Sequence, residues 1–389
     1  MRFFLICILI FQKRFFNNFH ISKQYNWYIF WYDFKKNTKL KEVILNLCVL
    51  FGGSSYEHEI SIVSAITLKK LLPSIETFVF LDGNHNFYLI PKDKMQSKFF
   101  SSKEYLKEMK IYLKVGGFYH KTLLGEKKLP MPMVLNLIHG GDGENGVIAS
   151  LLDFYGIAYI GPRNPACVLS FDKELTKLLA KNRGILSLDY QVFYKGAQKE
   201  IKFPFPVIIK PARLGSSIGI FIANNQKELD YGLEEAFEYD NKAIVEPFIS
   251  GIKEYNLAGY KSAQGIKFSF IEEPQKKEFL DFEKKYLDFS RTQNAKEADI
   301  PEALQKTLQD NFIKIYENLF EGALIRCDFF VKDDLCYLNE INPIPGSMAN
   351  YLFDDFKGAL EELSKNLPKS NEIRISYELL HKIQFAKGK

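Results

Sequence analysis

The pattern of apolar and polar positions from residue 45 onwards predicts strands and helices in alternation. Residues 45–51 (LNLCVLF) are nearly all apolar, which is typical of a strand that is buried on both faces of a parallel sheet. The glycine-serine turn that follows leads into a predicted helix that opens within residues 54–59. A second unit at residues 134–160 predicts a strand, the loop HGGDGENG, a helix and another strand. Both loops follow the carboxyl ends of strands, where open α/β sheets bind ligands.

The rest of the chain predicts further elements that suit additional lobes. Helices are expected at 172–182 and 301–321, and strands at 189–193, 207–210, 243–247, 254–260, 264–271 and in a final hairpin over 323–342. At 389 residues the chain is longer than the roughly 250–300 residues at which single hydrophobic cores stop growing. We therefore expect two or three packed lobes with a cleft available between them.

The final hairpin carries the most informative pattern of polar side chains. If residues 333–335 form a three-residue turn, Asp328 lies opposite Glu340 and Arg326 lies opposite Asn342. Because side chains alternate along a strand, all four would then share one face. Two carboxylates and a carboxamide are hard oxygen ligands that suit Mg²⁺ held jointly with nucleotide phosphates. The alternative is a solvated face of an edge hairpin, but such a face needs no acid, amide and arginine at matched positions.

Two glycine-serine loops, GGSS at 52–55 and ARLGSSIG at 212–219, have backbone N–H groups that can bind anions. Neither matches the pattern G-x-x-x-x-G-K-[ST], so each loop alone could equally be a tight turn. Lys210 stands directly before the second loop, and Lys173 opens the predicted helix at 172–182. Two cations in these positions can flank a triphosphate, which favours nucleotide binding.

Charge and cysteine content exclude other classes of protein. Residues 1–44 hold eight Lys or Arg and two Asp or Glu, a balance of +6 against +5 for the chain, so residues 45–389 carry about 5 − 6 = −1. The body of the chain therefore has no basic footprint, and we expect no nucleic-acid partner. The five cysteines are scattered without a C-x-x-C pair, which predicts free thiols in a reducing cytoplasm, without disulfides or a zinc site.

The first 44 residues differ from the rest in composition. Thirteen of them are aromatic, and an apolar run at 3–11 is too short for a spanning helix of about 20 residues and lacks a small-residue cleavage site. We interpret residues 1–44 as a non-native or disordered extension read from a mis-assigned start, with the functional protein beginning near Leu45. A genuine membrane-tethering segment is the alternative, and the expected cytoplasmic localisation depends on which holds.

Seven sequence strings resemble those of D-alanine–D-alanine ligases and occur in the same order. They are VLFGGSSYEHEIS, HGGDGENG, SFDKELTK, IIKPARLGSSIG, VEPFISGIKEY, DFEKKY and RCDFFVKDDLCYLNEINPIPG. The resemblance implies an ATP-grasp fold of mixed α/β and α+β type, in which two α+β lobes clamp ATP behind a Rossmann-like pre-ATP-grasp α/β domain. We expect that domain at 45–163, the central lobe at 164–246 and the C-terminal lobe, with a lid and a metal site, at 247–389.

The resemblance also assigns roles to individual positions. It places ATP against the phosphate-binding, hinge and ribose-binding side chains of Lys173, Lys210, Glu246, Phe248, Ile249, Glu254 and Lys285. It gives two Mg²⁺ or Mn²⁺ ions to Asp328, Glu340 and Asn342. It implies catalytic roles for Arg326 and the Gly346 N–H at the oxyanion, and for a hydrogen-bonded trio of Glu57, Ser216 and Tyr286. D-alanine would bind at Glu57 and His139 in the first subsite, and a homodimer is implied.

One position departs from the family pattern. A serine usually stands five residues after the glycine of the PG pair and holds the carboxylate of the second substrate, but here that position is Tyr351, followed by a matching Leu352. The Tyr351 hydroxyl could reach the carboxylate from farther away, or Ser347 could replace the missing serine. The second subsite is therefore open between these two side chains.

The expected reaction is the ATP-dependent joining of two D-alanines through an acyl phosphate, for peptidoglycan precursors. A D-alanine–D-lactate ligase would share nearly every motif and commonly has histidine where this chain has Tyr286. Another ATP-grasp carboxylate–amine ligase would not need the loops of Glu57 and His139. A non-catalytic nucleotide-binding protein would be expected to lose a metal ligand, whereas Asp328, Glu340 and Asn342 are all present.

Overall fold

The structure is a computed structural model that describes residues 47–130, 133–197, 200–274, 295–369 and 373–387. Residues 45–389 form a compact unit of their own, and only this unit is described. Within the described ranges, no helix combines the length and the apolar character needed to cross a membrane. The four cysteines in these ranges are buried free thiols, which confirms the expected thiol state for Cys48, Cys167, Cys327 and Cys336.

The first sheet has eight strands in the order β6-β5-β4-β3-β2-β1-β7-β8. The strands are β1 (Cys48–Gly52), β2 (Thr77–Leu81), β3 (Phe87–Ile90), β4 (Met109–Lys114), β5 (Gly117–Thr122), β6 (Gly125–Lys128), β7 (Val134–Asn136) and β8 (Tyr159–Ile160). The β1 strand is fully buried and runs parallel to β2 and β7, as its unbroken apolar run predicts. Because β1 and β7 are parallel neighbours, the loops that follow them meet at one edge of the sheet.

Helices pack on this sheet or join its strands. They are η1 (Lys92–Lys94), η2 (Glu104–Lys107), α3 (His58–Leu71), α4 (Ser97–Ser101), α5 (Gly141–Glu144), α6 (Val147–Phe154) and α7 (Asn164–Phe171). Ala65 and Leu68 of α3 are fully buried in the same core as Phe51 and Phe80 of the sheet. This packing fixes α3, and therefore the loop that precedes it, at the edge where β1 ends.

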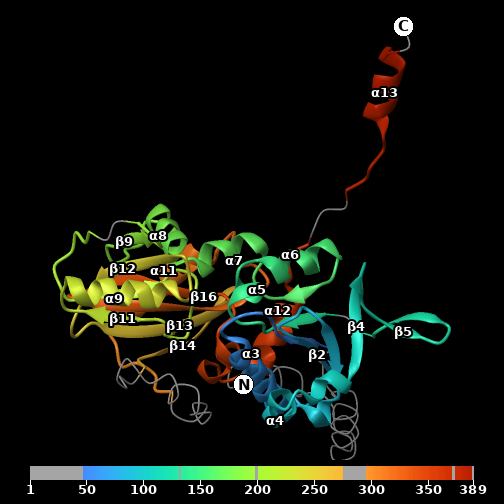
Figure 1. Ribbon diagram of the computed structural model, residues 1–389, viewed down its shortest axis with the longest axis horizontal. Coiled ribbons are helices and arrows are strands. Elements are labelled where there is room, and N and C mark those ends of the chain that lie inside the picture. Colours follow the sequence, from blue (N-terminus) through green and yellow to red (C-terminus); the bar gives the residue numbers. More distant parts are fainter. Residues whose placement is uncertain (1–46, 131–132, 198–199, 275–294, 370–372, 388–389) are drawn as a thin grey trace, which may run out of the picture. The chain divides into compact units, whose positions relative to one another are not determined.

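The second sheet has four strands in the order β11-β10-β12-β9. They are β9 (Gln191–Tyr194), β10 (Val207–Pro211), β11 (Phe221–Ala223) and β12 (Lys242–Pro247), with α8 (Lys173–Asn182) and α9 (Gln226–Phe237) in the same stretch of chain. The sequence analysis did not predict α9, although its buried Leu229, Leu233 and Ala236 are spaced as in an amphipathic helix. These side chains share a core with Val207 and Val245, so α9 covers one face of the sheet (Figure 1).

The third sheet also has four strands, in the order β14-β13-β15-β16. They are β13 (Lys253–Ser262), β14 (Gly265–Glu272), β15 (Leu324–Lys332) and β16 (Leu335–Asn342), and the accompanying helices are α11 (Glu302–Tyr316), η4 (Gly346–Leu352), α12 (Phe356–Lys365) and α13 (Glu378–Lys387). Leu308, Phe312 and Ile315 of α11 are fully buried in the core of this sheet with Cys327 and Phe329. Since alternate β15 residues enter this core, Arg326 and Asp328 face away from it.

Candidate active site

The β15–β16 hairpin opposes the four polar residues as predicted. Arg326 pairs with Asn342, and Asp328 pairs with Glu340, in an antiparallel ladder. Neighbouring Cys327 and Ile341 are buried in the core, at 0 % and 4 % exposure, so the polar residues occupy the opposite face. This pairing confirms the expected grouping of two carboxylates, an amide and a guanidinium.

The turn that joins these strands is not the predicted three-residue turn. Lys332 pairs with Leu335, which leaves a turn of two residues, Asp333 and Asp334, with φ of 49° and 62°. Two consecutive positive φ values suit the right-handed twist of a hairpin, and aspartate tolerates this conformation better than most residues. The prediction of the turn was wrong because the shorter connection is the one that matches the strand twist.

A β-bulge restores the pairing that the shorter turn would have shifted. Phe329 pairs with Leu338 while Asp328 pairs with Glu340, so Asn339 is an extra residue on β16. Its Oδ1 lies 3.4 Å from Lys210 Nζ, so Asn339 joins the polar side of the hairpin to the second sheet. The sequence analysis missed Asn339 because strict alternation would have turned it toward the core.

Arg326 holds Asp328 through two parallel hydrogen bonds. Its Nε and Nη2 donate to Oδ1 and Oδ2 of Asp328 at 2.7 and 2.8 Å, and Asn342 Nδ2 donates to Oδ2 at 3.0 Å. Burial raises the pKa of Asp328 to about 7, against the charge and hydrogen bonds of Arg326, which lower it. Asp328 is therefore a desolvated carboxylate whose ionisation depends on the cations beside it.

The predicted metal ligands form a sparse set. Among the described residues no group of three or more His, Cys, Asp and Glu side chains could hold a metal ion. The hairpin instead offers Asp328, Glu340 and the carboxamide of Asn342 on one face. These oxygen donors fit Mg²⁺, which usually keeps positions for phosphate oxygens and water beside one or two carboxylates.

Glu57 presents a buried carboxylate directly before α3. Its Oε1 accepts a hydrogen bond from the Ser216 hydroxyl, whereas Oε2 is buried and has no hydrogen-bond partner in the described part of the chain. Burial and then the charge of Glu144 raise the pKa of Glu57. A Cβ on Gly140, where φ is 62°, would lie only 2.6 Å from Oε2, so glycine is needed at this close approach. Oε2 could thus accept a hydrogen bond from a donor outside the described residues.

The two predicted phosphate-binding lysines lie beside the second glycine-serine loop. Lys173 begins α8, and its Nζ donates to the backbone carbonyls of Leu214 and Pro211, the latter at 3.3 Å. Burial lowers the pKa of Lys173, against the opposing charge of Glu340. Lys210 occupies β10 and is 7 % exposed. The structure therefore brings both cations to the loop that the sequence analysis selected for anion binding.

Glu246 forms a buried ion-paired cluster with two lysines. Lys177 Nζ lies 2.6 Å from Glu246 Oε1, and Lys210 Nζ lies 2.7 Å from Oε2. Burial alone would raise the pKa of Glu246, but the charges of Lys210 and Lys177 lower it to about 2. The sequence analysis missed Lys177, since one more lysine on a helix carries no signal until the strand that it faces is known.

The predicted adenine and ribose positions follow in order along the chain. Phe248 and Ile249 come directly after β12, and Glu254 is the second residue of β13; all three side chains are half-buried. The Phe248 N–H donates to the Pro206 carbonyl at 3.0 Å, which fixes the backbone at this connection. The connection therefore joins the second sheet to the third, and its predicted role as a hinge stays a prediction.

His139 and the segment Gly346–Leu352 meet at the buried side of α3. Ser64 Oγ lies 2.9 Å from His139 Nε2 and accepts a hydrogen bond of 3.0 Å from the Ser347 N–H. Tyr351 Oη accepts from Arg326 Nη1 at 3.3 Å. Gly346 is exposed and Leu352 is fully buried, so of these two only Gly346 has an accessible surface.

Three consecutive residues of this segment adopt the left-handed conformation. Ser347, Met348 and Ala349 have φ of 49°, 57° and 47°. Each left-handed residue with a side chain costs about 1–2 kcal/mol, so three in a row need support from their surroundings. Met348 and Ala349 are buried in the core that contains α3 residues, and the Met348 N–H donates to the Pro345 carbonyl at 2.8 Å.

Two predicted residues of the lid, Lys285 and Tyr286, lie outside the described residues. The trio of Glu57, Ser216 and Tyr286 is therefore represented by its first two members, which are hydrogen-bonded. The predicted contribution of the lid stays a prediction.

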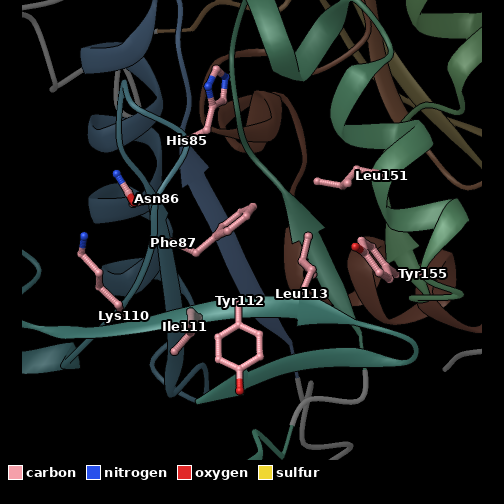
Figure 2. A pocket seen from close by; sticks show the side chains of 9 residues that line it. All are labelled: His85, Asn86, Phe87, Lys110, Ile111, Tyr112, Leu113, Leu151 and Tyr155. Carbon is pink, nitrogen blue, oxygen red and sulfur yellow. The ribbon is translucent and has the colours of Figure 1, made fainter. Parts of the chain in front are cut away.

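A separate pocket of about 350 Å³ lies between β3, β4 and α6 (Figure 2). Its lining includes Phe87, Lys110, Tyr112, Leu151 and Tyr155. None of the predicted site residues belongs to it. The side chains that are predicted to bind or catalyse lie instead where β1, β10 and the β15–β16 hairpin meet.

Two family models match most of the chain. The one described as "D-ala D-ala ligase N-terminus" matches residues 46–162, and the one described as "D-ala D-ala ligase C-terminus" matches residues 179–356. Together these ranges include every predicted site residue from Glu57 to Leu352 except Lys173, which lies in the gap between them.

Relatives and solved structures agree with this match. The D-alanine–D-alanine ligase of Wolinella succinogenes is 59% identical over 89% of this chain and 100% of its own length, and that of Campylobacter lari is 55% identical over 88% and 99%. The crystal structure of the Helicobacter pylori enzyme superposes with a TM-score of 0.76 at 50% identity, covering 84% of this chain and 99% of that one. These likenesses confirm the expected ATP-grasp fold with its preceding α/β domain, and the chain belongs to the D-alanine–D-alanine ligase family.

Proposed function

We propose that this protein joins two D-alanines into D-alanyl-D-alanine at the expense of ATP, for peptidoglycan synthesis. The observation that carries the proposal is Oε2 of Glu57, a buried carboxylate oxygen without a hydrogen-bond partner among the described residues, held beside the second glycine-serine loop. A desolvated carboxylate with one free oxygen is complementary to a small cation, and the ammonium of an amino acid supplies that charge. Family membership supports D-alanine as that amino acid.

In the first subsite, Glu57 would accept a hydrogen bond from the ammonium of the first D-alanine. The Ser216 hydroxyl donates to Oε1, so the ammonium would contact Oε2, which has no hydrogen-bond partner among the described residues. His139 is 3 % exposed, and Gly140 after it approaches Glu57 without a side chain. The carboxylate of a D-alanine bound in this way would lie toward the phosphate-binding lysines.

ATP would bind between the second and third sheets. Lys173 and Lys210 would contact its phosphates, while Glu246, Phe248, Ile249 and Glu254 would contact adenine and ribose along the hinge. Lys285 of the lid would add a further contact to ATP. Two Mg²⁺ or Mn²⁺ ions at Asp328, Glu340 and Asn342 would neutralise phosphate charge when bound. The paired lysines around Glu246 keep its carboxylate ionised, so it can accept a hydrogen bond from the adenine amino group.

The reaction would proceed in two steps. A carboxylate oxygen of the first D-alanine attacks the γ-phosphorus of ATP, the bond to the β-phosphate oxygen breaks, and ADP and an acyl phosphate result. The neutral amine of the second D-alanine then attacks the acyl carbon. Arg326 and the Gly346 N–H would stabilise the oxyanion of the tetrahedral intermediate, which expels inorganic phosphate while the amine loses its proton. Tyr286 with Ser216 and Glu57 would hold the lid closed, because water hydrolyses acyl phosphates.

The carboxylate of the second D-alanine would be held near Arg326. Tyr351 lies there already, with its Oη 3.3 Å from Arg326 Nη1, whereas the Ser347 backbone is directed toward Ser64. We therefore favour Tyr351 over Ser347 as the side chain that contacts this carboxylate. Leu352 is fully buried and would act by supporting the wall of the subsite.

We further propose that the enzyme acts in the cytoplasm as a homodimer. The buried free thiols of the described cysteines suit a reducing compartment, where ATP and peptidoglycan precursors are available. The homodimer rests on the family resemblance, and sedimentation of the purified chain tests it directly.

The test of function is product analysis by mass spectrometry. The purified chain is supplied with ATP, Mg²⁺ and equal concentrations of D-alanine and D-lactate, and ADP release is followed in parallel. We expect D-alanyl-D-alanine as the main product, formed in proportion to ADP. A predominance of D-alanyl-D-lactate would assign the alternative specificity, and ATP turnover without either product would reject the proposed reaction.

A further inference from the structure

Ser64 is a buried serine of α3 whose hydroxyl contacts two distant parts of the chain. It is 1 % exposed, and its Oγ lies 2.9 Å from Nε2 of His139, 75 residues away. The same oxygen accepts the backbone N–H of Ser347, 283 residues away, at 3.0 Å. One hydroxyl therefore joins the loop after β7 to the left-handed segment after β16.

The contact to His139 acts on the first subsite. His139 is followed directly by Gly140, the residue that approaches Oε2 of Glu57. The His139 carbonyl accepts a hydrogen bond from Ser55 Oγ at 2.7 Å, and the ring is held by Ser64. Backbone and side chain of His139 are thus both anchored beside the Glu57 carboxylate.

The contact to Ser347 acts on the other side of the site. Ser347 begins the run of three left-handed residues and is four residues before Tyr351, which contacts Arg326. The Ser347 carbonyl accepts from Asn350 Nδ2 at 2.9 Å, so both backbone polar groups of Ser347 have partners. Without Ser64, its N–H would lose the acceptor that pins the start of this run to α3.

The hydrogen-bond inventory of the Ser64 hydroxyl makes the two contacts compatible. Its oxygen accepts from the Ser347 N–H, which leaves the hydroxyl hydrogen available to donate to Nε2 of His139. Nδ1 of the same ring lies 3.7 Å from Glu144 Oε1.

We propose that Ser64 is a positioning residue that couples the two D-alanine subsites, an inference that rests on the proposed function. Its hydroxyl sets the distance between the His139 loop and the turn that carries Tyr351. Binding of the second D-alanine should depend on it most, because the strained left-handed run has more conformations to relax into than the His139 loop does.

Ser61 provides the matched control. It lies on α3, one turn before Ser64, is fully buried, and also uses its Oγ twice: it accepts from the Gly52 N–H at 2.8 Å and donates to the Leu137 carbonyl at 2.7 Å. Ser64→Ala and Ser61→Ala therefore remove equivalent pairs of hydrogen bonds. Both should lower the melting temperature, so a selective change in substrate binding identifies the coupling role.

The first measurement is the rate of ADP formation as a function of D-alanine concentration, fitted with separate KM values for the first and the second D-alanine. For Ser64→Ala we expect the KM for the second D-alanine to rise roughly tenfold. The KM for the first D-alanine and the KM for ATP should change by about threefold or less. For Ser61→Ala we expect no such split. Equal changes in all constants, or the same pattern in both variants, would overturn the proposal.

Hydrogen exchange separates this proposal from the reaction itself. In the full chain without substrates, the Ser347 amide should exchange at least about tenfold faster in Ser64→Ala than in wild type or Ser61→Ala. If the wild type forms no dipeptide, the proposed reaction is rejected. The exchange rate of the Ser347 amide still tests whether Ser64 holds the turn. Unchanged exchange in Ser64→Ala would overturn the coupling even in an active ligase.

Discussion

Ser216 and Glu57 are 159 residues apart in the chain, and the Ser216 hydroxyl donates a hydrogen bond to Oε1 of the Glu57 carboxylate. This bond orients the carboxylate so that only Oε2 remains without a partner in the described residues. The pair therefore defines both the position and the charge of the site at which an ammonium would bind.

Removing the negative charge of Glu57 should selectively weaken the binding of the first D-alanine. In Glu57→Gln, the KM for the first D-alanine should rise roughly a hundredfold, because loss of one partner of a buried charge pair costs about 2–5 kcal/mol. The KM for ATP should change by less than about threefold. Steady-state kinetics check this, with Glu59→Gln as the control because Glu59 is exposed in the first turn of the same helix. Equal increases in the KM for ATP and the KM for the first D-alanine would contradict the role assigned to Glu57.

Glu340→Gln should reduce turnover with little change in structure. The substitution removes a negative charge from the face shared with Asp328 and Asn342, and loss of a positioned metal removes several kcal/mol of transition-state stabilisation. We expect kcat to fall on the order of a hundredfold at saturating Mg²⁺. Asp334→Asn, in the exposed turn of the same hairpin, should retain near-normal kcat. A wild-type kcat in Glu340→Gln would show that Glu340 is not a metal ligand.

Glu246 should make the protein sensitive to acid. Its pKa is lowered from the ordinary 4.5 to about 2 in the folded state, so its ionised form stabilises the fold above the unfolded pKa. That contribution, about 3 kcal/mol by linkage, is fully present at neutral pH and is lost as the pH falls from about 4.5 to about 2. Urea denaturation as a function of pH measures this loss.

Lys177→Met tests the same cluster from the other side. With one of its two cations removed, Glu246 should have a higher pKa, and the loss of stability should begin at a higher pH than in wild type. The KM for ATP should also rise, because Lys210 would then be shared less favourably between Glu246 and the phosphates. Lys181→Met, on the same helix but exposed, is the control. An unshifted acid transition in Lys177→Met would show that Lys210 alone neutralises Glu246.

A chain that starts at Leu45 should fold and retain activity. The family models match from residue 46, and the relative from Wolinella succinogenes is covered over its full length by 89% of this chain. The three sheets and their cores are also formed by residues after 46. The melting temperatures of the shortened and full chains should agree. Their kcat/KM values should agree within about twofold. An insoluble or inactive shortened chain would show that residues 1–44 contribute to the fold or the site.

The sequence predicted the parts of the site that depend on local periodicity. Alternation along β15 and β16 placed Arg326, Asp328, Glu340 and Asn342 on one face, and the apolar run before the first glycine turn predicted the buried parallel strand. Both patterns arise within a few residues of the groups that they position. For this reason they could be read without knowledge of the fold.

The parts that were missed depend on contacts between distant segments. Lys177 acquires its role only because β12 brings Glu246 to it, and Ser64 only because the chain returns 283 residues later. The left-handed run at Ser347–Ala349 breaks the local preferences of its residues and is held by buried side chains of another element. Propensity and spacing carry no record of such contacts.

The bulge at Asn339 compensates for the length of the turn and thereby sets the strand register at the acidic residues of the hairpin. With the two-residue turn alone, Glu340 would lie opposite Cys327, a fully buried core residue, and its carboxylate would point into the core. Turn length and bulge are therefore coupled: inserting one residue into the turn should be tolerated only if Asn339 is deleted at the same time. Either change alone would shift the acidic face by one residue, and the pair together would restore it.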